Sequence, residues 1–268
     1  MMRHPAVSGQ FYYGSAPRLE QQVSQYVETG MAREKAVGIM VPHAGLVYSG
    51  PVAGAVYSSI EMPKTFVMIG PNHTGLGSRI AVMDEGEWEV PTGKLRIDRK
   101  LAGRILMNTE RAERDAKAHT FEHSLEVQVP FIVHFSPETA IVPIAMLAAT
   151  YDHCVELAEG VAKAIQSVDY PVTILASSDM SHYVPDRIAR QKDKTALDHL
   201  LSLDPRGLYD TVVRERLTMC GYIPATVMLI ASKILGAKSA RLVRYMTSGD
   251  ISGDYESVVG YAGVVLTA

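Results

Sequence analysis

Two short apolar runs that each end in a proline and a histidine constrain the fold of this chain most. The first, residues 36–45 (AVGIMVPHAG), delivers His43, and the second, residues 65–75 (TFVMIGPNHTG), delivers His73. Continuous apolar runs of this length are typical of buried strands in a parallel sheet. Because open α/β sheets bind ligands at the carboxyl ends of their strands, the two histidines indicate a site at that edge. A metal ion is the ligand we expect there.

Further apolar runs alternate with amphipathic stretches along the chain, which is typical of an α/β fold. Core strands are expected at residues 139–145 and 171–176. The last two apolar runs, 240–247 and 257–266, are expected to pair antiparallel, and recurring turn signals predict a hairpin-like excursion over 79–97. Helices are expected at residues 17–28, 51–60, 98–108, 151–168, 186–202, 205–214 and 224–235.

Residues 36–70 are interpreted as a β–loop–α–β unit with parallel strands and a right-handed crossover. Pro51 is expected in the first turn of its helix, where the missing N–H is not needed. No linker, repeat or shift in composition divides the chain. We therefore expect one α/β domain over residues 1–268, with a mixed, mostly parallel central sheet and helices on both faces.

Composition limits the compartment and the partners. A net charge of -3 without a cluster of Lys and Arg argues against nucleic acid or an anionic membrane as the partner. No apolar run approaches the ~20 residues of a membrane span, and the N-terminal stretch lacks a secretory apolar region. Two cysteines, Cys154 and Cys220, are too few for a disulfide framework. We expect a cytoplasmic protein that binds a small molecule or a peptide.

A third strand end also carries polar groups, because residues 171–176 lead into Asp179 and His182. Each strand-end histidine, taken alone, fits equally well a loop residue bonded to the backbone. Three such ends on one sheet would instead bring His43, His73 and the Asp179/His182 pair into one crevice. Convergence therefore favours a functional site.

Cys220 precedes a helix that is expected to begin near Pro224. The free N–H groups and the dipole of a helix N-terminus favour a thiolate. The alternative is a buried apolar cysteine beside Met219, a common fate of free cysteines. Cys154 lies in the middle of a predicted helix and is expected to be structural.

His123 is flanked by Glu122 and by Glu126, three residues later. A carboxylate at that spacing can share a helical face with the histidine and orient its ring. The alternative is a solvated, charged helix start. His119, four residues before His123, could extend the cluster but lies in a more polar stretch.

The ligand types limit the chemistry. Histidine and cysteine suit Zn, Fe or Cu better than Mg or Ca, and three protein ligands with an open position would make a catalytic metal site. His182 and His123 are candidates for acid/base groups that do not bind the metal.

A serine hydrolase is the obvious alternative, given Ser177, Ser178 and Ser181 close to Asp179 and His182. The chain lacks a G-x-S-x-G motif, and an acid and a histidine three residues apart cannot flank a serine in the usual relay. Neither a G-x-G-x-x-G nor a P-loop pattern occurs, so no nucleotide site is indicated.

The chain resembles the Memo protein family in five ordered blocks, VPHAGLVYSG, GPNHTG, EHSLEVQVP, SSDMSHY and MCGYIP. The similarity extends from AVSGQFYYG near the start to VVGYAG near the end. Memo proteins are similar in fold to the class III non-haem iron extradiol dioxygenases. The resemblance therefore implies a single α/β domain, with a site at the position equivalent to the dioxygenase iron.

By this resemblance, the metal-binding positions of the family fall on His43, His73 and Cys220. Three further residues of the matching blocks would line the same pocket as catalytic groups: His123, Asp179 and His182. The dioxygenases use two histidines and a carboxylate. A thiolate at the third position implies a preference for Cu(I), Zn or a differently tuned iron.

The resemblance has local departures. Animal Memo proteins often read GPSHH and CGRHP, whereas this chain has Thr74 after His73 and has Tyr222 and Ile223 before Pro224. Two histidines near the site are therefore absent. The growth-factor-receptor signalling of the animal proteins, which runs through phosphotyrosine peptides, has no counterpart in these residues and is not carried over.

Three functions follow as expectations. The first is a redox enzyme that depends on iron or copper. The second is a non-catalytic binding module that uses the same pocket for a peptide or a small ligand. The third is a hydrolase or cyclase in which the metal activates water.

Overall fold

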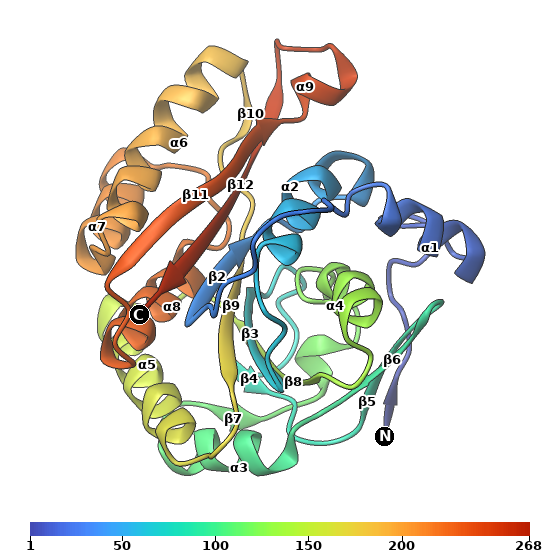
Figure 1. The fold of residues 1–268 in the computed structure, drawn as a ribbon. Helices are drawn as coiled ribbons and strands as arrows, with labels where there is room; N and C mark the ends of the chain where they lie inside the picture. The colour runs from blue at the N-terminus through green and yellow to red at the C-terminus, as the bar shows by residue number, and fades with distance from the viewer.

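The apolar runs form a nine-stranded central sheet in the computed structural model, which describes residues 1–268 (Figure 1). Along the sheet the strand order is β10 (His182–Val184), β12 (Val258–Thr267), β2 (Gly38–Val41), β9 (Val172–Ser177), β3 (Thr65–Pro71), β8 (Ala140–Met146), β4 (Ile80–Val82) and β7 (Glu113–Arg114). A further strand, β11 (Ser239–Thr247), pairs antiparallel with β12, as the sequence predicts.

The central strands β2, β9, β3 and β8 are all parallel. β12 on one side and β4 on the other are antiparallel to them, which makes the sheet mixed. The two strands of the predicted β–loop–α–β unit are parallel but not adjacent, because β9 lies between them. The carboxyl ends of β2, β9 and β3 therefore lie side by side at one edge, in that order.

Helices cover both faces of the sheet, which confirms the predicted architecture (Figure 1). One face carries α3 (Arg99–Met107), α5 (Tyr151–Gln166), α6 (Asp186–Leu201), α7 (Pro205–Glu215) and α8 (Tyr222–Ile234). The other face carries α1 (Ala16–Ser24), α2 (Leu46–Ser58) and α4 (Val129–Phe135). Two large hydrophobic clusters result, and β2 serves both: Met40 belongs to the first, whereas Ile39 and Val41 belong to the second. This alternation is the period of two expected for a strand.

The predicted excursion over residues 79–97 divides between two sheets. β4 joins the central sheet, whereas β5 (Glu87–Val90) and β6 (Gly93–Arg96) form a hairpin. β1 (Met2–Arg3) adds to that hairpin in parallel and completes a small second sheet. Short helical turns occupy the remaining connections: η1 (Lys117–His119), η2 (Glu126–Gln128) and α9 (Gly249–Ser252).

Two predicted helix limits are wrong. α1 ends at Ser24 rather than residue 28, and α2 begins at Leu46 rather than near Pro51. The backbone N–H of Leu46 donates to the carbonyl of Phe11 at 2.7 Å. A partner outside the helix therefore satisfies one of the free N–H groups of its first turn. Pro51 therefore lies inside the helix, where its ring removes one bond to the carbonyl of Val47, a residue 52% exposed to water.

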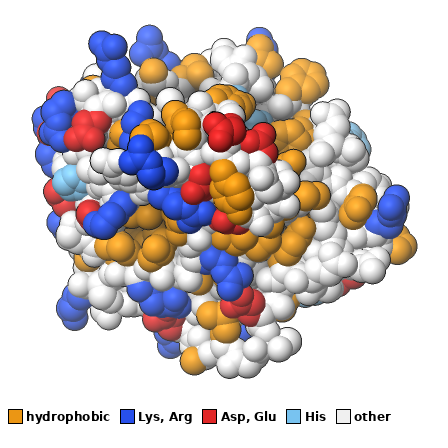
Figure 2. Space-filling view, turned by 90° about the horizontal axis from the view of Figure 1, so that it is seen from above, with side chains coloured by type: hydrophobic (Ala, Val, Ile, Leu, Met, Phe, Trp, Pro, Cys, Tyr) orange, Lys and Arg blue, Asp and Glu red, His pale blue; other side chains and the backbone are white.

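The surface visible in Figure 2 mixes Lys and Arg with Asp and Glu around hydrophobic side chains. That face carries no continuous basic patch of the kind that binds nucleic acid. None of the helices has both the length and the apolar character that a membrane crossing needs.

Candidate metal site

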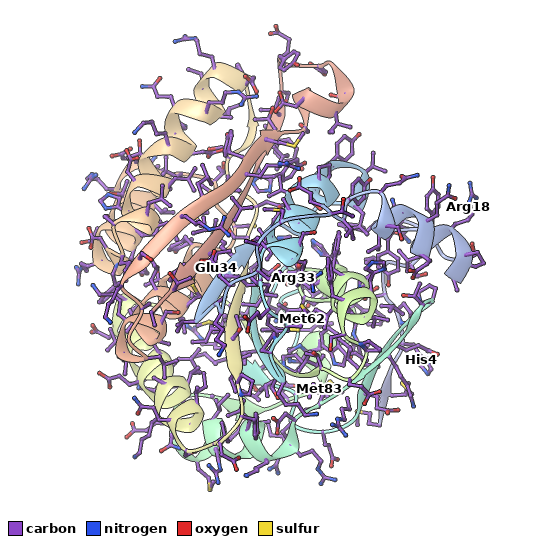
Figure 3. The ribbon with its side chains drawn as sticks, viewed as in Figure 1. His4, Arg18, Arg33, Glu34, Met62 and Met83 are labelled. Atoms are coloured by element: carbon purple, nitrogen blue, oxygen red, sulfur yellow. The ribbon has the colours of Figure 1, made fainter.

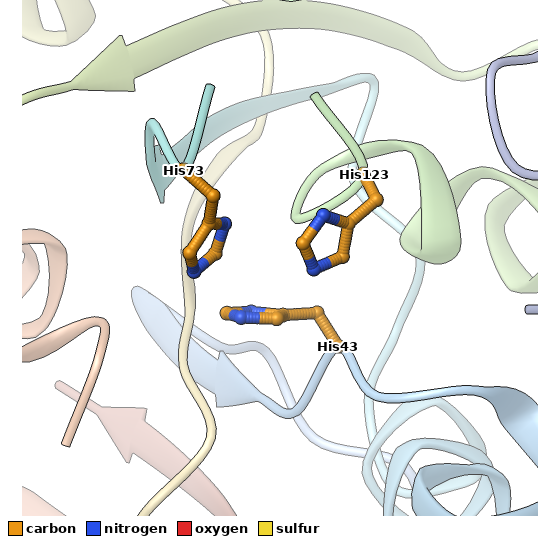
Figure 4. Close-up of side chains that lie close together, drawn as sticks. All are labelled: His43, His73 and His123. Carbon is orange, nitrogen blue, oxygen red and sulfur yellow. The ribbon is translucent and has the colours of Figure 1, made fainter. Parts of the chain in front are cut away.

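Three histidines converge at the carboxyl edge of the central sheet. His43 follows β2, His73 follows β3, and His123 comes from the connection between η1 and η2. One ring nitrogen of each lies within 4.8 Å of the others. Figure 4 shows the three rings facing one another across a common space. The centroids of the rings lie 5.3 Å apart for His43 and His73, and 4.7 Å apart for His73 and His123.

The ring of His43 is held in one tautomer. Its Nδ1 lies 2.9 Å from the hydroxyl of Ser177, and that hydroxyl donates to the carbonyl of Ser124 at 2.6 Å. Because the single proton of Ser177 is used in this way, its oxygen accepts from Nδ1–H of His43. The same oxygen also accepts from the side-chain amide of Gln128 at 3.1 Å. The lone pair of His43 is therefore on Nε2 and is free to bind a metal.

Glu122 fixes the tautomer of His73 in the same way, with a proton on Nδ1. Its carboxylate is almost fully buried and accepts from Nδ1 of His73 at 2.9 Å and from the N–H of Ser124 at 2.8 Å. Burial alone would raise the pKa of Glu122. The hydrogen bonds from His73 and Ser124, together with the electrostatic attraction of His73 and His123, outweigh burial and lower the pKa to about 2. Nδ1 of His123 lies 3.4 Å from the same carboxylate oxygen. Metal-binding histidines commonly have such a carboxylate behind the ring.

Glu126 does not orient His123, contrary to the sequence interpretation. Its carboxylate has no exposed surface and accepts from four groups of the N-terminal segment: the guanidinium of Arg3, the N–H groups of Ala6 and Val7, and the hydroxyl of Tyr12. The segment also carries Phe11, whose ring lies 4.7 Å from that of His123. The N-terminal segment thus forms one wall beside the cluster. Nothing in the local spacing predicts this partner.

Cys220 lies next to the histidines, immediately before α8. Its Sγ is 3.2 Å from Nε2 of His43 and accepts the N–H of Asp179 at 3.3 Å. Burial, with a smaller contribution from Asp179, raises the pKa of the Cys220 thiol. The helix start does not offset this, because the N–H of Gly221 donates to the hydroxyl of Ser178 instead. Without a metal, Cys220 is therefore a buried thiol that donates to His43, which agrees with the second of the two alternatives left open by the sequence.

Asp179 and His182 follow β9 at the same edge. The Asp179 carboxylate accepts the backbone N–H of His43 at 2.8 Å, and burial raises the pKa of Asp179 to about 6. Nδ1 of His182 lies 2.9 Å from the carbonyl of Thr218. Because a carbonyl only accepts, His182 carries its proton on Nδ1 and leaves Nε2 available. His182 is half-buried and close enough to contribute to the lowered pKa of His43.

The serines near this edge do not form a hydrolase relay. The hydroxyl of Ser177 donates to Ser124, and that of Ser178 donates to the carbonyl of Asp179 at 2.8 Å. The hydroxyl of Ser181 is buried without a partner. None of the three serines bonds to the ring of His182, so no serine is activated as a nucleophile.

His119 does not join the cluster. It is fully buried, its Nε2 lies 3.1 Å from the carbonyl of Ala81, and its ring packs edge-on against Trp88. Sequence reasoning also missed Gln128, whose amide nitrogen donates to the carbonyl of Pro42 at 2.9 Å. Its position in the EHSLEVQVP block is the signal that could have identified it.

The comparisons with known proteins agree with one another. The family model described as Memo-like protein matches residues 3–265. A MEMO1 family protein of Methanothermobacter thermautotrophicus is 39% identical over 98% of this chain and 99% of its own length, and one of Methanosarcina acetivorans is 40% identical over 99% of each. An uncharacterized protein of Escherichia coli K12 has a similar fold, with a TM-score of 0.60 at 12% identity over 86% of this chain and all of its own. The chain belongs to the Memo-like protein family.

Proposed function

We propose that this protein is a metal-dependent redox enzyme whose metal ion is held by His43, His73 and Cys220. The observation that carries the proposal is the histidine cluster, in which groups behind the rings direct unprotonated nitrogens toward one point. An ordinary loop histidine does not need such an arrangement. Iron and copper are the proposed metals, and zinc is the alternative that the same ligands accept.

Two of the three proposed donor atoms have the spacing of ligands to one ion. Sγ of Cys220 and Nε2 of His43 are 3.2 Å apart. The two ligands of a tetrahedral ion, with metal–sulfur and metal–nitrogen bonds of about 2.3 and 2.0 Å, lie roughly 3.5 Å apart. Burial of the thiol is not an obstacle, since metal binding displaces the proton of a cysteine ligand. His123 lies next to these ligands, with a ring nitrogen within 4.8 Å of nitrogens of His43 and His73.

When bound, the metal would supply redox and Lewis-acid chemistry, and the residues around it would handle protons. Asp179, with a pKa near 6, can hold or release a proton close to neutral pH. Nε2 of His182 is free to accept a proton from a substrate, and His123, the third histidine of the cluster, has the same proposed role. Glu122 remains a carboxylate and keeps His73 oriented.

Oxygen consumption by the protein loaded with Fe(II) or Cu(I) tests this function. With a panel of catechol-like and other reduced compounds, we expect turnover that falls at least about tenfold in His43→Ala. The control is His134→Ala, which removes a histidine paired with Glu20 away from the cluster. Loaded protein without turnover on the whole panel would contradict an enzyme function.

A binding module for a peptide or small ligand is the second candidate. Four exposed hydrophobic side chains favour it, all in segments that adjoin the site: Val47, Tyr48, Phe121 and Tyr183. Tyr183 is 80% exposed and has a positive φ of 57°, which is uncommon for a non-glycine residue. For this function, ligand binding should survive His43→Ala.

Both cysteines are free thiols, which supports the proposal of a reducing, cytoplasmic compartment.

A further inference from the structure

A cavity of about 740 Å³ lies at the edge of the sheet opposite the metal site. Its floor is formed where β3, β8 and β9 begin, at Thr65, Ala140 and Pro171. The end of β6 and the start of α3 form its other side. Because β3 has seven residues, the length of a strand, roughly 20 Å, separates this cavity from His73. Its volume is in the range of small-molecule sites.

Exposed basic side chains without ion-pair partners line this cavity, and Lys100 lies over the ring of Tyr170, 5.9 Å from its centroid. Lys64, Arg96 and Lys100 all contribute to it, and none of them forms an ion pair. Glu87 lies directly across the hairpin from Arg96, but its carboxylate is bonded to Lys94 at 2.8 Å. Three unpaired cations around one cavity repel each other. A bound anion would relieve that repulsion.

The acidic residues of the cavity do not neutralise these cations. Asp98 caps α3 through the N–H of Leu101, and its second oxygen accepts the hydroxyls of Thr65 at 2.8 Å and Tyr170 at 2.6 Å. These bonds hold the carboxylate against the wall but leave its negative charge in place, so it offsets only part of the positive charge of the lining. Glu138 is the other carboxylate in the lining, against four Lys and Arg side chains.

We propose that this cavity binds a small phosphate compound. Lys64, Arg96 and Lys100 surround its phosphate group at the start of α3. Pro171 and Met62, the latter labelled in Figure 3, form an apolar part of the cavity wall. The site is separate from the histidine cluster, and its occupancy does not depend on a metal.

Pyrophosphate titrated calorimetrically into the metal-free, full-length protein at low ionic strength tests the proposal. We expect saturable binding of one equivalent with a submillimolar Kd, weakened at least about fivefold by Lys64→Ala or Lys100→Ala, and weakened by added salt. The matched control is Lys163→Ala, which removes an exposed lysine of α5 outside the cavity. His73→Ala should bind pyrophosphate like the wild type, which separates this site from the metal site.

The other results would overturn the proposal. Absence of saturable binding would exclude a phosphate site. Equal weakening by Lys100→Ala and Lys163→Ala would show that only net charge matters. Equal affinity for sulfate, tested in parallel, would show that the cavity takes any dianion rather than a phosphate. Loss of binding in His73→Ala would place the pyrophosphate at the histidine cluster.

Discussion

His119 shows how burial separates one histidine from the others. Its ring lies in the core against Trp88, and Nδ1 has no hydrogen-bond partner. Burial is the main cause that lowers the pKa of His119 to about 4 from the ordinary value of 6.5. The hydrogen bond to Ala81 opposes this shift, and the charge of Arg3 adds to it. The unfolded chain binds a proton at His119 near pH 6.5, whereas the folded chain binds it only near pH 4. Stability from this group is therefore present above pH 6.5 and lost as the pH falls.

This pKa shift predicts the pH dependence of unfolding. Between pH 7 and pH 4, His119 should cost the wild type on the order of 3 kcal/mol of unfolding free energy. His119→Gln keeps a donor for Ala81 but cannot take up the proton, so its unfolding free energy should fall less over the same range. Urea unfolding at several pH values measures both slopes, with His134→Gln as the control. Equal slopes for wild type and His119→Gln would contradict the assignment.

The N-terminal segment is attached to the site through one buried carboxylate. Glu126→Gln removes the carboxylate partner of Arg3, whose guanidinium keeps its bonds to the carbonyls of His119 and Glu122. It also turns an amide toward the backbone N–H groups of Ala6 and Val7. Breaking a buried ion pair in this way costs about 3–5 kcal/mol. We expect a loss of that size in urea unfolding, together with faster proteolysis before residue 15.

The matched control for Glu126→Gln is Glu34→Gln, which breaks an exposed pair with Arg241. Exposed pairs contribute about 0–1 kcal/mol. If the two variants lose the same amount of stability, Glu126 does not hold the segment.

α2 packs on the segment after α1 with no room for a side chain at Gly54. A Cβ there would lie 2.0 Å from the carbonyl oxygen of Tyr26, so Gly54→Ala must displace the helix. We expect a loss of at least about 1–3 kcal/mol in thermal or urea unfolding. Gly103, inside α3, has nothing within 4 Å of its Cβ position. Gly103→Ala should instead gain roughly 0.5–1 kcal/mol from helix propensity, and a gain in both variants would refute the close approach.

Much of the architecture follows from the sequence because local patterns determine it. The apolar runs that end at His43 and His73 are long enough to be buried strands, and parallel strands place their carboxyl ends together. The order of the strands was not predictable, because the insertion of β9 between β2 and β3 depends on pairing between distant residues. The start of α2 depends likewise on the distant carbonyl of Phe11.

The candidate site was likewise predictable only in part. His43, His73, Asp179 and Cys220 could be named from strand and helix ends, and the structure brings them together. The place of His123 beside them could not be derived from spacing, since an irregular connection carries it. The sequence left open whether Cys220 is a thiolate or a buried thiol, because its burial depends on the packing of the whole domain.

The metal content of the purified protein shows whether the histidine cluster and Cys220 hold an ion. The protein should be purified without added metal or an affinity tag, alongside Cys220→Ser, His43→Ala and the control His134→Ala. We expect about one equivalent of a transition metal in the wild type and the control. In the other two variants the metal affinity should be at least about tenfold weaker, so they should retain less metal through purification. Unchanged metal content in Cys220→Ser and His43→Ala would contradict the proposed metal site.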